Sequence, residues 1–297
     1  MRRLTYTDQN GISYVLNDDI SASLVWNGLR GFGMPRLSLA TQRVPYQSGA
    51  ALLGAPYMAP REMRVALDVS KATFDARIAY ERTLRRNLSP FKDTDSLGTL
   101  TVQDTGNSVT RAIDCWLVEA PDPDEQGPFA STVVLTFFAP DPFFYDPTVQ
   151  TENLALAGDS GITFPITFPI TFGSTTIDSY VYPNNQGDVE TWPTIRVNGP
   201  GANIELTNDT TGKTLALTTG GGVTLDVGDY VTIDMAEATV TWYDATDGST
   251  TSVIEKLSDA SEFWPLVRGV NAVHGEMTAT VSGSIVFSYY LYYQSGG

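Results

Sequence analysis

The sequence is poor in the residues from which most catalytic and metal sites are built. Among 297 residues there is one cysteine, Cys115, and one histidine, His274. A single cysteine excludes an internal disulfide framework and a zinc site made of several cysteines, and a single histidine excludes a multi-histidine centre. Lys and Arg number 18 against 34 Asp and Glu, a net charge of −16 that argues against nucleic-acid binding. We expect no cofactor and no bound metal.

Long apolar runs are also missing. The residues after Met1-Arg2-Arg3 lack the apolar core of a signal peptide. The longest uncharged run, residues 160–177, is broken by Pro165 and Pro169, so it does not read as a membrane-spanning helix. An apolar fraction of 42% with 11% aromatic residues is typical of globular proteins. The sequence predicts a soluble protein without membrane insertion.

Charge divides the chain into two parts. Residues 1–146 carry 14 basic and 17 acidic side chains, a net charge of −3, whereas residues 147–297 carry 4 and 17, a net charge of −13. The change falls after Pro140, Pro142 and Pro147, which cannot continue a central strand. We predict an N-terminal β domain over residues 1–146, an extended arm over 147–178 and a C-terminal β-sandwich over 179–297.

The first domain reads as strands around one helix. Asp8 to Gly11 is a turn between two short strands, and Gly28 to Pro60 is an excursion rich in Gly and Pro. Alternation predicts a strand at Val65–Val69, and Phe129–Ala139 reads as a central strand covered on both faces. A long hairpin is expected around Gly106, with Ile113, Cys115 and Leu117 on one face of its second strand.

A helix is expected from a cap at Ser70 to about Asn87. Phe74, Ile78, Leu84 and Leu88 fall on one side, which Glu81 and Arg85 interrupt at a spacing that lets them pair. Two interpretations stay open. The two charged side chains extend along the core's edge to reach water, or this face contacts another subunit. The candidate interface residues are Phe74, Ile78, Glu81, Arg85 and, at the hairpin tip, Gly106.

The arm contains the one clear internal repeat, Ile162 to Phe172, in which every even position is Ile or Phe. Period two indicates an extended chain with one apolar edge, and its prolines confine it to a sheet edge or an arm. Exposed apolar side chains would favour aggregation, so we predict that the arm packs against a surface of its own chain or a neighbour. The packing residues are Phe164, Ile166, Phe168, Ile170 and Phe172.

The second domain is denser in strand signals. Alternating pairs of apolar residues recur every 8–12 residues between Gly- and Asp-rich turns, a pattern typical of a sandwich or jelly roll. A long aromatic strand at Ile285–Tyr293 closes the chain.

Catalytic motifs do not rise above background. His274 lies in a turn-like context, where an ordinary loop histidine is the simpler interpretation, and Cys115 reads as an inert core thiol. Asp122 to Glu125 reads as a solvated turn. A carbohydrate platform and core packing are both open for a group of aromatic residues: Trp192, Trp242, Trp264, Tyr230 and Tyr243.

The order of motifs resembles the distal tail protein family of long-tailed, non-contractile bacteriophages, the siphovirus tail components. The motifs are Arg82 to Pro90, Gly98 to Val102, Arg111 to Cys115, Leu135 to Pro142, Asn185 to Asp188, Trp192 to Ile195, Asn198 to Pro200, Asn208 with Thr211-Gly212, Asp229 to Asp234, Phe263 to Leu266 and Gly269 to Asn271.

The resemblance implies a mainly β fold in which an N-terminal β domain with one α-helix and a long hairpin precedes a galectin-like sandwich. It further implies a non-enzymatic virion protein, made in the host cytoplasm, that forms a homohexameric ring between the tail tube protein and the tail-tip hub protein. Tape measure, fibre and receptor-binding proteins are further candidate partners. The alternatives are a carbohydrate-binding module or adhesin, motivated by the aromatic residues, and a cell-wall hydrolase using paired carboxylates.

Overall fold

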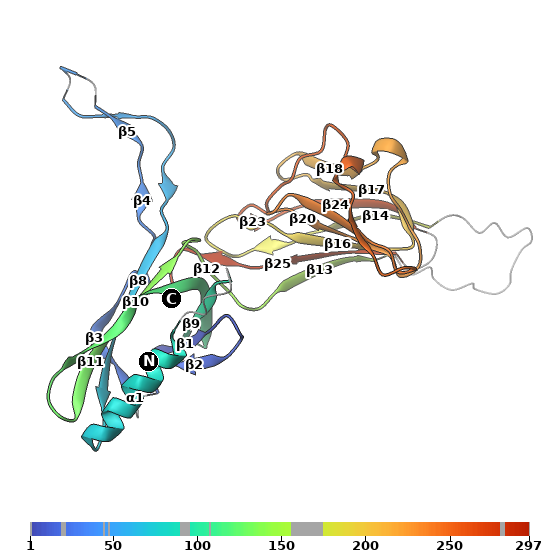
Figure 1. The fold of residues 1–297 in the computed structure, drawn as a ribbon. Coiled ribbons are helices and arrows are strands. Elements are labelled where there is room, and N and C mark those ends of the chain that lie inside the picture. The colour runs from blue at the N-terminus through green and yellow to red at the C-terminus, as the bar shows by residue number, and fades with distance from the viewer. Residues whose placement is uncertain are drawn as a thin grey trace, which may run out of the picture. The chain divides into compact units, whose positions relative to one another are not determined.

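The structure is a computed structural model that describes residues 2–18, 22–43, 45–46, 48–89, 96–106, 108–155, 175–279 and 283–296 (Figure 1). It contains two compact units. Unit 1 consists of Met1–Pro147 with Tyr293–Gly297, and unit 2 of Thr148–Tyr292. The predicted mainly β fold is confirmed, and α1 is the one α-helix of the described ranges. At 14 residues, α1 is too short and too polar to cross a bilayer, and the described ranges hold no other candidate span.

The sheet of unit 1 has nine strands: seven follow the order β2-β1-β9-β10-β11-β8-β3, and β12 pairs with both β10 and β26 (Tyr292–Tyr293). The turn predicted at Asp8–Gly11 joins β1 to β2, and the alternation in Val65–Val69 belongs to a longer strand, β8. The elements are β1 Arg2–Thr7, β2 Ser13–Val15, β3 Ala22–Arg30, β8 Arg61–Ser70, α1 Phe74–Asn87, β9 Gly98–Asp104, β10 Val109–Glu125, β11 Ala130–Ala139 and β12 Phe144–Tyr145.

The long strand β10 joins two halves of the sheet. Residues 109–115 pair with β9, and residues from Trp116 onward pair with β11 across register shifts between Leu117 and Asp122. Such irregularities increase local twist and let one strand serve both halves. Asp122–Glu125, expected as a turn, is the end of this strand because it continues to pair with β11. The core lies between the two halves, around Leu4, Leu100, Leu67 and Phe137.

Strand β11 is central but is buried on one face only. Val133, Leu135, Phe137 and Ala139 are fully buried, whereas the residues between them are half-exposed. The prediction that both faces are covered is therefore wrong. Apolar residues at both odd and even positions suggested two covered faces. Among the described residues of unit 1, however, no element covers the second face completely.

Helix α1 ends at Asn87, as predicted, but begins later. Thr73 is the N-cap and its hydroxyl accepts a hydrogen bond from the Ala76 N–H at 3.2 Å, whereas Ser70 is the last residue of β8. The buried stripe also differs from the predicted one: it consists of Arg77, Glu81, Leu84 and Leu88, while Phe74 and Ile78 are exposed. Both stripes have helical spacing and share Glu81, Leu84 and Leu88, so docking on the sheet decides which residues of the first turns are buried.

The excursion after β3 is a two-stranded arm rather than a loop (Figure 1). β4 (Leu37–Ser38) pairs with β7 (Tyr57–Met58), and β5 (Thr41–Gln42) pairs with β6 (Ala51–Leu52). From Arg36 to Pro60, none of the described residues is buried. The arm therefore has no hydrophobic core of its own.

Unit 2 is the predicted β-sandwich. One sheet has the order β13-β25-β16-β20-β21-β22, and the other β14-β24-β17-β18 with β19 beside β17. Its elements are β13 Gln150–Ala155, β14 Thr175–Val181, β15 Asn184–Asn185, β16 Thr194–Asn198, β17 Gly201–Asn208, β18 Lys213–Leu217, η1 Thr219–Gly221, β19 Thr224–Leu225, β20 Tyr230–Asp234, β21 Thr239–Tyr243, β22 Thr250–Ser252, η2 Ile254–Lys256, β23 Gly269–Val270, β24 Val273–Ala279 and β25 Ser284–Tyr289. The last strand, β26 (Tyr292–Tyr293), pairs with β12.

Both ends of the segment expected as an extended packing arm, residues 147–178, lie in sandwich strands. β13 pairs with β25, and β14 pairs with β24. The five packing residues Phe164, Ile166, Phe168, Ile170 and Phe172 lie outside the described residues. The closing strand is shorter than expected, because β25 ends at Tyr289 and the last residues join unit 1, where Gly296 N donates to Phe32 O at 2.9 Å.

Candidate subunit interface

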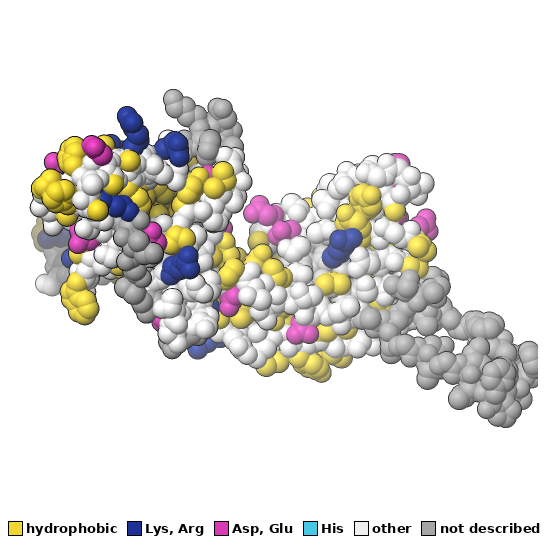
Figure 2. All heavy atoms as spheres, turned by 90° about the horizontal axis from the view of Figure 1, so that it is seen from below, with side chains coloured by type: hydrophobic (Ala, Val, Ile, Leu, Met, Phe, Trp, Pro, Cys, Tyr) yellow, Lys and Arg dark blue, Asp and Glu magenta, His cyan; other side chains and the backbone are white. Residues whose placement is uncertain are grey.

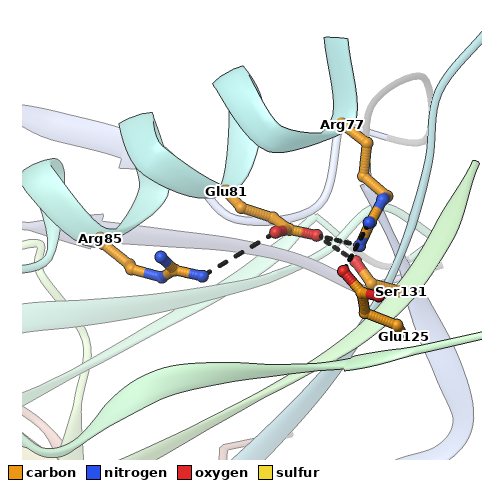
Figure 3. Close-up of polar contacts among 5 residues, drawn as sticks. All are labelled: Arg77, Glu81, Arg85, Glu125 and Ser131. Atoms are coloured by element: carbon orange, nitrogen blue, oxygen red, sulfur yellow. Dashed lines mark hydrogen bonds and ion pairs between the residues drawn. The ribbon is translucent and has the colours of Figure 1, made fainter. Parts of the chain in front are cut away.

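Glu81, a predicted interface residue, points into unit 1 (Figure 3). Its carboxylate accepts hydrogen bonds from Arg77 at 2.9 Å and from the Ser131 hydroxyl at 2.6 Å, and the side chain is 4% exposed. Arg77 is fully buried and also donates to Glu125 at 2.7 Å, an interaction that raises the pKa of Arg77. These contacts attach the helix to β10 and β11. The charged side chains Arg77 and Glu81 on this helix face therefore form their contacts mainly within unit 1.

Arg85 lies at the edge of this cluster. It is half-exposed and its guanidinium is 3.8 Å from the Glu81 carboxylate, so the predicted pairing forms. Phe74 is 49% and Ile78 39% exposed, and the Arg77 guanidinium lies 5.2 Å from the Phe74 ring centroid. Phe74, Ile78 and Arg85 are thus the members of the predicted face that are open to a partner.

Gly106 lies at the exposed tip of the β9–β10 hairpin. Its N–H donates to the Asp104 carboxylate at 3.0 Å, which closes the turn locally. The tip is polar and is not brought together with the helix residues by any contact among the described residues. Gly106 and α1 are therefore two separate candidate surfaces.

The β4–β7 arm and the neighbouring edge strand β3 expose more large apolar side chains than helix α1. Seven large apolar side chains of the arm are exposed: Met34, Leu37, Leu39, Tyr46, Leu52, Leu53 and Tyr57. On β3, Trp26 is 93% exposed, and it lies where the pairing with β8 is interrupted between Leu24 and Leu29. Figure 2 shows apolar side chains, with Lys and Arg among them, at the surface of unit 1. The Asn27-Gly28 turn signal inside a strand was the clue to this bulge that sequence reasoning missed.

A hollow of about 460 Å³ lies on the outer face of β3, β8, β10 and β11. It is lined by Arg30, Glu62, Met63, Arg64, Glu119 and Thr136. Arg30 stands directly opposite Arg64 in the strand register, and neither forms an ion pair with another described residue. Like charges in direct cross-strand positions destabilise a sheet unless a counter-charge is supplied.

The catalytic candidates do not come together. His274 lies in strand β24 rather than in a turn, where its ring nitrogens face two carboxylates and no hydroxyl or thiol among the described residues. Cys115 is fully buried in unit 1, and burial raises the pKa of its thiol, consistent with the predicted inert core residue.

The aromatic residues do not form one platform. Trp264 is fully buried, while Tyr230 and Tyr243 are cross-strand neighbours with ring centroids 4.7 Å apart. The Arg196 guanidinium lies 3.7 Å from the Tyr230 ring centroid. Because sugars stack on an open aromatic face, a ring engaged by both a tyrosine and an arginine offers little platform.

Asparagines in two of the motifs that carry the family resemblance stabilise loops of unit 2 by hydrogen bonds to the backbone. The buried Asn185 side chain donates to the carbonyls of Val189 and Leu266 at 2.8 and 3.1 Å, and it accepts from Gly187 N at 3.0 Å. Buried Asn271 likewise donates to the Val267 carbonyl at 2.8 Å. Such bonds satisfy backbone groups that would otherwise be buried unpaired, so these asparagines are structural.

Comparison with known proteins agrees with this architecture. Residues 186–289 match the family model described as the siphovirus-type tail component, C-terminal domain. The crystal structure of SPP1 Dit, described as a paradigm of the hub adsorption apparatus in phages that infect Gram-positive bacteria, covers 97% of this chain and 98% of its own, with 18% identity and a TM-score of 0.59.

Two structures of the phage p2 baseplate in its activated conformation, with Sr and with Ca, align over 97% and 98% of this chain and 98% of theirs, with 13% and 14% identity and a TM-score of 0.40. No curated protein matches the sequence. Over 97% of the chain the fold is similar to that of SPP1 Dit. Over residues 186–289 the sequence is similar to the C-terminal domain of the siphovirus-type tail components.

Proposed function

We propose that this chain is a phage tail component, a non-catalytic virion protein that closes a ring of identical copies, a hexamer, at the tip of a phage tail. The ring joins the tail tube to the tail-tip hub and offers unit 2 as a docking platform for host-recognition proteins. The likeness in fold to SPP1 Dit, described as part of a hub adsorption apparatus, supports these roles.

The observation that carries the proposal is the exposed apolar surface of the β4–β7 arm. Six large exposed apolar side chains stand on a two-stranded ribbon with no buried residue between Arg36 and Pro60 among those described. Isolated ribbons of this kind are at best marginally stable in water, and exposed apolar patches of this size mark interaction sites. Copies related by a ring axis give every arm the same apolar surface to pack on.

The distribution of charge supports the same arrangement. Residues 1–146, with a net charge of −3, can pack against copies of themselves at little electrostatic cost. Residues 147–297 carry −13, which suits a domain that projects into solvent.

Native mass spectrometry and light scattering of the full chain test the ring. We expect a closed oligomer that forms with increasing concentration or on addition of the hub protein. Leu52→Ser combined with Leu53→Ser should prevent it while leaving the circular dichroism spectrum unchanged, because both side chains are 63% exposed in the isolated chain. Phe74→Ser with Ile78→Ser tests the helix face in the same way.

The matched control is Val227→Ser, which removes an equally exposed apolar side chain from unit 2 and should leave assembly intact. A chain that stays monomeric at high concentration and with the hub protein would refute the ring. Labelling of intact particles with an antibody to unit 2 should mark the tail tip, and labelling elsewhere would refute the location.

A further inference from the structure

The outer face of one sandwich sheet holds the chain's single histidine between two carboxylates. His274 Nε2 lies 2.8 Å from Asp178 Oδ1, and Nδ1 lies 3.6 Å from Glu276 Oε1. The imidazole is 18% exposed, whereas the Asp178 and Glu276 side chains are 70% and 50% exposed. The two carboxylates thus face different nitrogens of the ring, and both are open to solvent, so either side chain has room to rotate.

A row of three carboxylates crosses this sheet. Asp178 on β14 stands opposite Glu276 on β24, and Glu276 stands opposite Glu205 on β17. Directly opposed like charges destabilise a sheet. In the described ranges no Lys or Arg forms an ion pair with these three acids. The row concentrates negative charge where only His274 can offset it.

From this geometry we propose that Asp178, His274 and Glu276 bind a divalent transition-metal ion of the Zn²⁺ or Mn²⁺ class. One ligand atom from each residue lies within 4.8 Å of the others. Metal–ligand bonds of about 2.0–2.2 Å place ligand atoms about 3–4 Å apart. Because the two exposed carboxylates face different ring nitrogens, one of them must rotate toward the nitrogen that binds the ion to complete the site. Imidazole with carboxylate suits these ions, whereas Ca²⁺ and Mg²⁺ take oxygen ligands. Water occupies the remaining positions.

The surroundings hold the histidine in place for this role. The Tyr180 ring stacks on the imidazole with centroids 4.5 Å apart and planes at 22°. Between the two β24 ligands, Gly275 sits tightly over the core, because a Cβ there would lie 2.7 Å from Leu154 Cδ1. β14 and β24 pair without a shift from Thr175 to Val181. The donors therefore stand on rigid strands, which favours metal binding over a flexible surface cluster.

The site is independent of ring assembly, because all its residues lie in unit 2 and on neighbouring strands of one sheet. A bound ion replaces the repulsion between Asp178 and Glu276 by shared coordination and links β14 to β24. The expected result of binding is a more stable sandwich, since a ligand that binds only the folded state raises its stability.

Isothermal titration calorimetry on the full, tag-free chain tests this proposal after chelator treatment. We expect saturable binding of one Zn²⁺ per chain, weaker binding of Mn²⁺, and no comparable binding of Ca²⁺ or Mg²⁺. His274→Gln and Glu276→Gln should each weaken Zn²⁺ binding at least about tenfold. Glu262→Gln is the matched control, because its carboxylate pairs with Lys213 at 3.1 Å and should not affect binding.

A nuclear magnetic resonance readout is unusually direct because the chain has one histidine. Substoichiometric Mn²⁺ should broaden the imidazole C–H signals before other signals, and the same addition should leave the His274→Gln spectrum without a preferential effect. Absence of saturable Zn²⁺ binding, or equal affinity in His274→Gln, would overturn the proposal. The proposal would also be overturned if the stability of unit 2 rose only on acidification and did not change with metal. The acids would then serve to hold a protonated imidazole.

Discussion

Replacing Arg61 tests how the base of the arm is held. Arg61 is 3% exposed and donates to four backbone carbonyls: Gly31, Gly33, Pro142 and Gln294, at 2.7, 2.6, 2.8 and 2.8 Å. Its guanidinium also lies 4.8 Å from the Phe144 ring centroid. One side chain therefore joins the base of the arm, the Pro-rich segment after β11 and the C-terminal residues.

The expected loss can be estimated from these contacts. Burial lowers the pKa of Arg61 to about 10, so the guanidinium remains charged at neutral pH and depends on the carbonyls for compensation. A hydrogen bond from a charged donor contributes about 1.5–3 kcal/mol. Because water and relaxation recover part of four such bonds, we expect Arg61→Met to destabilise unit 1 by about 3–5 kcal/mol. Arg61→Lys keeps a charged donor, so it should lose somewhat less stability than Arg61→Met. It should still be destabilised, because one ammonium cannot reach four acceptors arranged around a planar fork.

Urea denaturation followed by tryptophan fluorescence measures the effect. With a slope of about 2 kcal/mol per molar for a unit of this size, the unit 1 midpoint should fall by about 1.5–2.5 M, and the unit 2 transition should not move. Arg64→Met is the control, because Arg64 lies on the same strand but is exposed and should cost less than about 0.5 kcal/mol. Equal midpoints for the two variants would refute the role assigned to Arg61.

Two further predictions concern unit 1. Burial raises the pKa of Tyr6 from 10.0 to about 12, so the folded state keeps a proton that the unfolded state loses. This contribution is complete below pH 10 and is lost as the pH rises to about 12. With an allowance for solvent screening it amounts to about 1–2 kcal/mol. Tyr6→Phe should lose less stability over that range in alkaline urea titrations, and an identical pH profile would contradict the assignment. Gly31→Ala should cost more than about 3 kcal/mol, because φ is +81° and a Cβ would run into the carbonyl oxygen of Glu62; Gly11→Ala, at φ +78° in open space, should cost about 1 kcal/mol. Equal thermal unfolding of the two glycine variants would refute the steric part of this reasoning.

Some assignments needed only local patterns. Alternation along Val65–Val69 lies in β8, and the turn at Asp8–Gly11 lies between β1 and β2. The helix end at Asn87 and the strands of the sandwich were likewise predictable. Each depends on neighbours within a few residues, where turn chemistry and a period of two or 3.6 leave a direct signal.

A mainly β fold with one helix and a sandwich was predictable from the sequence alone, because local periodicity and turn residues specify element type. Which helix stripe is buried depends instead on contacts across the fold: Arg77 donates to Glu125, and Glu81 accepts from Ser131, about fifty positions away in the chain. The fold also brings Asp178 beside His274, 96 positions apart. Such pairings depend on which strands become neighbours, and that is settled by packing of the whole domain rather than by any local pattern.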